Sequence, residues 1–448
     1  MNSFDKVIGY DSIKSEMLRI VDMLKNRERY AALGAKIPRG VLMYGDPGLG
    51  KTLVATAFIR ESGLFCRTVR RKNGGPDFIK EIGKAFAEAR ENAPSIVFLD
   101  DMDKFSNEDE RHRDAEEYVT VQSCIDECAG SGVFVIATVN DMDKLPGSLK
   151  RAGRFDLKIR FETPDGEDAK KIIRYYLAGK KIAEDVDFDD LVKMMSYSSC
   201  SELETILNDA AIRAAYAKKS CVEMEDLISS VLAMQYHIGT GWSVDPDDDD
   251  DDDDDDYGFE SDPSFTVRKT AAEEIGRIAL HEAGHLVVSE AVRSGSVGFA
   301  TIRSDGSGTG GYVHNCLPIE RRRDLILMAL AGKAAVELYH AETCASGCSD
   351  DIGRAVSLIR DGILDSGTHG LGAVDTSYRT RYSETYLTMV ETLVRAELEK
   401  NMFAVRDLLL KNRDFLEKVA DALLKKDVLL YSNVRKIRES VTVSPSVA

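Results

Sequence analysis

Gly45-Asp46-Pro47-Gly48-Leu49-Gly50-Lys51-Thr52 decides the fold of the first part of the chain. It follows a short apolar run, Gly40 to Tyr44, which is typical of a buried strand, and a helix-forming sequence begins at Leu53. Between a strand and a helix, these glycines allow main-chain N–H groups to surround phosphates. Lys51 then reaches the outer phosphates, and the Thr52 hydroxyl binds Mg²⁺. We therefore expect residues 45–52 to bind ATP with Mg²⁺.

Two further apolar runs end in polar residues. Ile96 to Leu99 leads to Asp100 and Asp101, and Val133 to Ala137 leads to Asn140. A carboxylate at the end of a buried strand beside the phosphate loop is the usual second Mg²⁺ partner, a role we assign to Asp100. Asp101 stands where such ATPases normally carry a glutamate that orients the attacking water, and Asn140 is placed to sense the γ-phosphate.

An arginine pair follows these strands. Arg151 and Arg154 flank Gly153. They are either a surface pair or, in an oligomeric ATPase, arginine fingers that reach the γ-phosphate of a neighbouring subunit. The alternating strand and helix patterns of residues 4–160 predict a parallel α/β sheet, and the helical pattern from Asp165 to about residue 238 predicts a small lid.

His281-Glu282-Ala283-Gly284-His285 is the second informative stretch. Histidines four residues apart project from one face of a helix, so both imidazoles can bind one Zn²⁺. Glu282 can then activate a water molecule and pass its proton to the leaving amine. The alternative is a helix with two unrelated histidines, so other parts of the chain must support a zinc peptidase.

Composition narrows the possible functions. The 448 residues carry a net charge of −18, ten of which come from the run Asp247 to Asp256, and this acidity argues against a nucleic-acid partner. No run of about 18 apolar residues occurs, so we expect no membrane span. The first five residues lack the features of a secretory signal, and eight scattered cysteines fit a reducing cytoplasm.

The clearest boundary is the acidic segment, whose like charges predict an extended, disordered linker. We expect this division: an α/β ATPase domain at 1–162, a helical lid at 163–238, an acidic linker at 239–268, a mainly α-helical zinc peptidase domain at 269–440 and a tail at 441–448. Helices are expected at about 320–340, 350–365 and 383–425, with strand-like inserts at 299–302 and 311–314.

In this order, the motifs resemble the FtsH-type ATP-dependent zinc metalloproteases of the AAA+ superfamily, from Phe4 to about Arg438. Residues 151–156 resemble the family's second homology region, and residues 347–352 resemble its Gly-Ala-Ser-Asn-Asp-Ile sequence. The resemblance implies that Asp351 is the third zinc ligand, although Asp350, one residue away, remains an alternative. It also implies polypeptide substrates and a ring, which we expect to be a homo-hexamer.

The resemblance extends to less defined positions. Val7, Ile8 and Gly9 fall where the family packs adenine. The stretch from Gly310 to Pro318 resembles the edge strand that pairs with substrate. Glu337 lies in a sequence similar to a family helix, which implies either that it holds a ligand histidine or that it is a surface acid.

The chain also departs from the family. It begins at the ATPase rather than at transmembrane helices, and residues 70–75 carry no aromatic residue of the pore loop. Ser199-Cys200-Ser201-Glu202 replaces the lid sequence Ser-Gly-Ala-Asp, and Asp101 replaces glutamate. We therefore expect an ATP-dependent zinc endopeptidase. Two alternatives remain: a weakly hydrolysing ring with ATP-independent peptidase activity, and a non-proteolytic remodelling ATPase.

Overall fold

The structure is a computed structural model, and it describes residues 3–71, 76–106, 116–151, 153–239, 263–304, 310–340, 348–366 and 384–446. The chain divides into two compact units. The first consists of Met1–Glu184 and Ser196–Val222, and the second of Asp185–Met195 and Glu223–Ala448. Most of the acidic segment, and Lys72 to Gly75 of the expected pore-loop region, lie outside the described residues. The predicted linker disorder and domain boundaries therefore stay predictions.

A five-stranded parallel sheet forms the centre of the first unit, in the order β2-β3-β4-β1-β5. The strands are β1 (Gly40–Tyr44), β2 (Phe65–Arg70), β3 (Ser95–Asp100), β4 (Val133–Val139) and β5 (Leu157–Arg160). All residues of β3 and β4 are buried, as expected of strands covered on both faces. The predicted parallel α/β sheet is confirmed.

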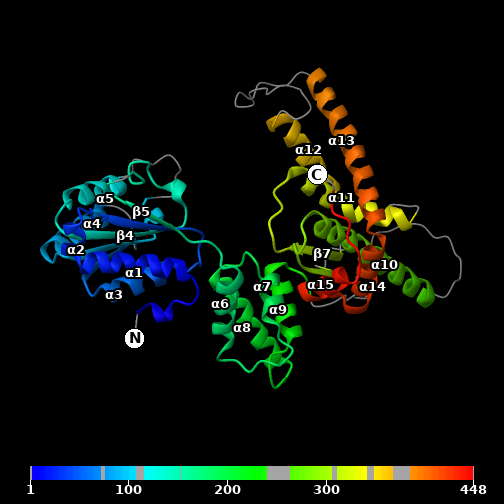
Figure 1. Ribbon diagram of the computed structural model, residues 1–448, viewed down its shortest axis with the longest axis horizontal. Helices are drawn as coiled ribbons and strands as arrows, with labels where there is room; N and C mark the ends of the chain where they lie inside the picture. The colour runs from blue at the N-terminus through cyan, green and yellow to red at the C-terminus, as the bar shows by residue number, and fades with distance from the viewer. Residues whose placement is uncertain are drawn as a thin grey trace. The chain divides into compact units, whose positions relative to one another are not determined.

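Helices cover both faces of this sheet. Figure 1 shows α1 and α3 on one side and α4 and α5 on the other. The helices of this unit are η1 (Ser3–Lys6), α1 (Asp11–Lys25), α2 (Arg27–Ala32), α3 (Lys51–Ser62), α4 (Pro76–Glu91), η2 (Met102–Lys104), α5 (Glu116–Glu127), η3 (Met142–Lys144), α6 (Gly166–Leu177) and α8 (Cys200–Tyr216).

The strand register brings the polar strand ends together. Tyr44 pairs with Val139, and Arg70 pairs with Asp100. Because the strands are parallel, the carboxyl ends of β1, β2, β3 and β4 meet at one edge of the sheet. The loop of residues 45–50 leaves β1 at this edge and leads directly into α3.

The second unit is mainly helical, as predicted, with a three-stranded antiparallel sheet in the order β7-β6-β8. Helix α10 lies at its centre and packs against α11 and α14. Its elements are α7 (Phe188–Met194), α9 (Met224–Gln235), α10 (Pro263–Val292), β6 (Val297–Ser304), β7 (Gly310–Asn315), α11 (Arg322–Tyr339), α12 (Ser349–Ser366), α13 (Glu384–Lys411), α14 (Arg413–Lys426), β8 (Val428–Leu430) and α15 (Tyr431–Glu439).

The helical stretch expected at 383–425 is two helices that meet at Asn412. The Asn412 side chain is buried, donates to the carbonyl oxygen of Leu408 at 2.9 Å and accepts from the amide of Ser444 at 2.7 Å. Its amide thus bonds both α13 and the C-terminal segment, which favours a break at this residue. Among the described residues, no helix combines the length and apolar character needed to cross a membrane.

Candidate functional site

The two histidines of the His281–His285 motif lie on one face of α10, as the i, i+4 spacing predicts. Their Nε2 atoms are 3.0 Å apart. Asp351, in the first turn of α12, completes the cluster: its Oδ2 lies 3.1 Å from His281 Nε2 and 3.0 Å from His285 Nε2. One ion can therefore contact all three atoms. Asp350 is exposed and lies outside this group.

Two contacts hold the imidazole rings in place. His285 Nδ1 donates to the carbonyl oxygen of Met328 on α11 at 2.8 Å, which leaves Nε2 available as a ligand atom. A Cβ on Gly332 would lie 2.3 Å from a ring carbon of His281, so only glycine fits at this point of α11. Two imidazoles and a carboxylate are a donor set that suits zinc.

Burial and charge set the ionisation of the cluster. Burial raises the pKa of Glu282 to about 8, because the attraction of His285 offsets only part of the desolvation. Burial lowers the pKa of His281. Burial is also the largest single effect on His285, but the hydrogen bond and charge of Asp351, together with Glu282 and the Met328 carbonyl, outweigh it and raise the pKa of His285 to about 9. Burial alone would raise the pKa of Asp351, but both histidines together hold it well below its usual range.

These residues line a cavity of about 460 Å³ formed by α10, β7, α11 and α12. The Glu282 side chain is buried beside the histidines and lies against Gly311 of β7. Its carboxylate is therefore close to the metal-ligand candidates without being one of them. A cavity of this size, with an acid, two imidazoles and a strand at its wall, can hold an extended peptide against a metal ion.

Glu337 does not contact a histidine. Its carboxylate bonds Lys333 at 2.7 Å and also bonds Arg406. It is a half-buried acid in an ion-pair cluster, which is closer to the second of the two interpretations from the sequence. The interpretation that it holds a ligand histidine was wrong.

The phosphate loop and the strand-end acids meet at the edge of the first sheet. Lys51 Nζ donates to the carbonyl oxygens of Gly45 and Asp46, at 2.6 and 2.7 Å. Thr52 Oγ1 donates to Asp100 Oδ1 at 2.9 Å, so the two expected Mg²⁺ partners are adjacent. Asn140 follows the last residue of β4. It stays a prediction that the nucleotide and Mg²⁺ are bound by Gly45, Asp46, Pro47, Gly48, Leu49, Gly50, Lys51, Thr52, Asp100 and Asn140.

Three residues around Asp100 and Asp101 were missed. Thr138 Oγ1 donates to Asp100 Oδ1 and accepts from the Asp101 amide, both at 2.9 Å. Arg70 Nη2 lies 3.4 Å, and Lys104 Nζ 3.1 Å, from Asp101 Oδ2. Thr138 had a sequence signal, because it lies at the end of a buried strand. Arg70 had none, because its position depends on the pairing of β2 with β3.

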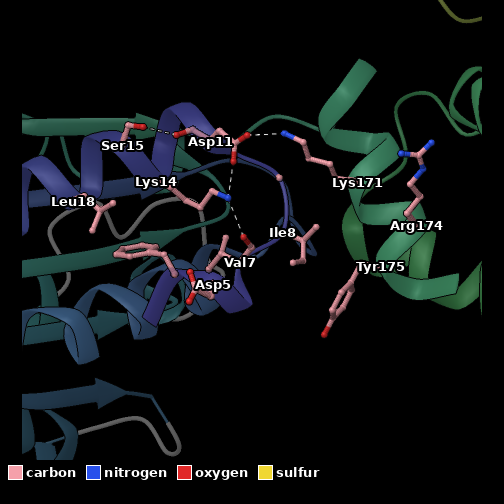
Figure 2. Close-up of a pocket in the computed structure, with 12 residues that line it drawn as sticks. Asp5, Val7, Ile8, Asp11, Lys14, Ser15, Leu18, Lys171, Arg174 and Tyr175 are labelled. Atoms are coloured by element: carbon pink, nitrogen blue, oxygen red, sulfur yellow. Dashed lines mark hydrogen bonds and ion pairs between the residues drawn. The ribbon is translucent and has the colours of Figure 1, made fainter. Parts of the chain in front are cut away.

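The three residues expected to pack adenine line a pocket of about 870 Å³ between α1 and α6. Figure 2 shows Val7 and Ile8 beside α1, and Lys171, Arg174 and Tyr175 on α6 across the opening. Asp11 bonds both Lys14 and Lys171 at 2.6 Å. Gly9 has φ +72° and lies against Asp168 of α6, so the segment 7–9 joins the two helices.

The two arginines have different surroundings. Arg154 Nη2 lies 2.8 Å from Asp126 Oδ2 on α5, and Arg154 also bonds the carbonyl oxygen of Ser148. Arg151 is exposed. Within one chain, therefore, Arg151 projects into solvent while Arg154 is held on its own sheet domain. Two residues of the family-like sequences lie outside the described residues: Ala152, between the two arginines, and Gly347, before Cys348.

Comparisons with known proteins match both parts of the chain. The model of the ATPase family associated with various cellular activities (AAA) matches residues 41–163, and that of peptidase family M41 matches residues 268–437. The ATP-dependent zinc metalloprotease FtsH 3 of Symbiobacterium thermophilum is 30% identical over 98% of this chain and 71% of its own length. The corresponding FtsH proteins of Caldicellulosiruptor bescii and Mycoplasma mobile are 29% and 27% identical, over 97% and 98% of this chain and 72% and 63% of their own lengths.

Proposed function

This chain belongs to the FtsH family of ATP-dependent zinc metalloproteases, and we propose that His281, His285 and Asp351 bind its zinc ion while Glu282 is its general base. The proposal is carried by one observation: three ligand atoms lie 3.0–3.1 Å from one another in a cavity that also holds a buried, non-ligand glutamate. A zinc ion bound there would supply Lewis acidity toward water and the peptide carbonyl.

Different residues of the chain would then have different roles in peptide hydrolysis. Strand β7 would hold the substrate backbone in extended form beside α10. Glu282 takes a proton from the attacking water and gives it to the nitrogen of the leaving amine. His285 keeps its orientation through the carbonyl oxygen of Met328, and Gly332 leaves room for the His281 ring.

For the nucleotide, we propose that residues 45–52 bind the phosphates of ATP. Thr52 and Asp100 would hold Mg²⁺, Asp101 would orient the attacking water, and Asn140 would contact the γ-phosphate. The bond between Thr52 and Asp100 supports this assignment, because both oxygens face one position. Val7, Ile8 and Gly9 would pack against adenine.

We further propose a homo-hexameric ring that feeds polypeptides to the zinc site. In such a ring, Arg151 and Arg154 would act on the nucleotide of the next subunit. Arg151 is exposed, so it can reach a neighbouring subunit. Arg154 would either break its ion pair with Asp126 to do the same or keep that pair and help to position Arg151. The seven cysteines among the described residues are all free. Free thiols are typical of proteins in a reducing compartment, which supports the proposal that this protein acts in the cytoplasm.

A second mode of action is favoured by one observation. Asp101 is one methylene shorter than glutamate, and Arg70 and Lys104 bind its carboxylate. ATP would then mainly stabilise the ring, and the peptidase would cut unfolded chains without hydrolysis. The match to a peptidase family argues against a third alternative, a non-proteolytic remodelling ATPase.

Degradation of one folded and one unfolded fluorescent protein tests the proposal. Each would be incubated with ATP, with a non-hydrolysable analogue, or with ATP and a zinc chelator. Cleavage of both proteins only with ATP and zinc is the expected result. Cleavage of the unfolded protein alone, equally fast with the analogue, would support the second mode. Cleavage that survives complete removal of zinc would reject the metal-site assignment.

A further inference from the structure

The active-site cavity contains two buried polar groups that the peptidase chemistry does not use. Ser289 of α10 is 1% exposed, and its Oγ has no hydrogen-bond partner among the described residues. The Oδ1 atom of Asn315, at the end of β7, is buried and equally without a partner within the described ranges. Both residues line the same cavity as His281, Glu282 and His285. Unsatisfied buried polar groups cost free energy, so they are unusual unless a ligand completes them.

The position of Ser289 follows from the helix. It lies four residues after His285, on the same face and about 6 Å further along the axis. Helix α11 runs antiparallel to α10 here, because His281 lies against Gly332 and His285 against Met328. Continuing this register by one turn places Ser289 opposite Leu325.

Asn315 and Ser289 line the same cavity, and Ser296 connects the segments that carry them. Ser296 makes a hydrogen bond to each segment. Its Oγ donates to the carbonyl oxygen of Ser289 at 3.1 Å, and its own carbonyl oxygen accepts from the amide of Cys316, the residue after Asn315, at 2.7 Å. Asn315 also pairs with Val297 in the sheet. The two unpaired groups therefore occupy the same end of the cavity, next to the histidines.

The surroundings of this end decide what it can bind. The α11 residues that line the cavity here are Leu325, Met328 and Ala329, which are apolar. Apart from Glu282 and the metal-ligand candidates, the charged lining residues lie on the N-terminal side of His281 and on α12; they are Glu274, Arg277, Asp350 and Arg354. A charged substrate side chain at Ser289 would lose its hydration against the uncharged α11 residues that line this end.

We propose that Ser289 and Asn315 form a polar subsite that binds a neutral amide side chain, asparagine or glutamine, of the polypeptide next to the bond that is cut. The inference rests on the proposed peptidase function and names a substrate preference of that site. A carboxamide offers both a donor and an acceptor, and so do a serine hydroxyl and an asparagine amide. An apolar residue of the same size leaves both protein groups unpaired.

Quenched fluorescent peptides that differ at one residue test this preference. The full chain, loaded with zinc, would be given peptides with Gln, Met or Glu placed in turn before and after the cleaved bond, and mass spectrometry would locate the cut. We expect kcat/KM for Gln to exceed that for Met by about 3- to 30-fold at one position, the effect of one or two neutral hydrogen bonds. Glu should be cut more slowly than Gln.

Ser289→Ala and Asn315→Leu should each bring the Gln-to-Met ratio close to one, while Ser440→Ala, a surface serine of the same unit, should leave the ratio as it is. Thermal unfolding gives a second measurement. Ser289→Ala should melt at the same or a higher temperature, because it removes an unpaired hydroxyl, whereas a purely structural serine would melt lower.

The outcomes separate the two proposals. Zinc-dependent cleavage with a Gln-to-Met ratio near one in the wild-type protein, or a ratio unchanged by both variants, overturns the subsite alone. A lower melting temperature for Ser289→Ala, with an unchanged ratio, would make Ser289 a structural residue. Failure of the wild-type protein to cut any peptide, or cleavage that persists in Glu282→Gln, overturns the proposed function and the subsite with it.

Discussion

Gly311 of β7 lies directly against the carboxylate of Glu282: a Cβ atom on Gly311 would come within 2.4 Å of Glu282 Oε1. The backbone φ of Gly311 is +102°, which side chains rarely adopt. The strand expected to hold substrate and the expected general base are thus in contact. Any side chain at residue 311 must push the carboxylate away or move the strand.

We therefore expect Gly311→Ala to lower kcat/KM for peptide cleavage by at least about tenfold, since small displacements of catalytic groups are costly. Gly310→Ala is the matched control. Its Cβ would come closest to the flexible end of Ile278, at 3.1 Å, and would lie at an ordinary contact distance of 3.5 Å from the Ile302 carbonyl oxygen, so cleavage should change little. An equal loss of kcat/KM in both variants would show that activity depends on the conformation of the strand rather than on the contact between Gly311 and Glu282.

Glu282→Gln should reduce peptide cleavage by about 10² to 10⁴, the usual contribution of a general acid–base group. Bound zinc and ATP affinity should remain, because Glu282 is neither among the three ligand candidates nor in the first unit. Metal analysis and nucleotide titration check these two points. Glu337→Gln is the control, since it removes half-buried ion pairs to Lys333 and Arg406 and is not among the residues that line the cavity. Undiminished cleavage by Glu282→Gln would reject its role.

Asp101→Glu should raise the steady-state rate of ATP hydrolysis, by about tenfold, because the longer side chain extends the carboxylate beyond Arg70 and Lys104. The control is Asp143→Glu, whose side chain is 95% exposed and has no part in the nucleotide site. The measurement is phosphate release at saturating ATP. An unchanged rate would mean that aspartate already positions the water well enough.

Local sequence patterns indicated most residues of both candidate sites, and the roles of these residues stay predictions. The phosphate loop lies between one strand and one helix, and the two histidines lie on one helix, so neither depends on distant parts of the chain. Asp351 was different: it lies 66 residues after His285, and only the family resemblance indicated it. Its position is set by how α12 packs, which helix periodicity does not encode.

Contacts between separate elements could not be predicted. Arg70 reaches Asp101 only because β2 pairs with β3 in the register that places Arg70 beside Asp100. Ser289 and Asn315 each look ordinary in the sequence, and their shared position depends on the packing of α10 against β7. Strand register and helix packing come from the whole core, so a single segment cannot specify them.

His314, which is not one of the candidate zinc ligands, should make the stability of the fold depend on pH. His314 of β7 is 7% exposed, packs against Phe299, and its Nδ1 lies 3.2 Å from the Tyr236 hydroxyl. Burial lowers the pKa of His314 to about 4, whereas the unfolded chain titrates near 6.5. Below pH 6.5 the unfolded chain therefore binds more protons than the folded chain, and stability falls as the pH falls toward 4.

At pH 5 this difference should cost about 2 kcal/mol of unfolding free energy relative to pH 8. His314→Gln, which cannot titrate, should lose less stability between pH 8 and pH 5 by this amount, measured by denaturant unfolding at each pH. Both proteins share the candidate zinc ligands, so the difference between their two stability changes does not contain the contribution of those residues. His340→Gln, at the end of α11, is the control and should follow the wild-type curve. Parallel curves for the wild-type protein and His314→Gln would show that His314 is protonated, or exposed, in the folded chain.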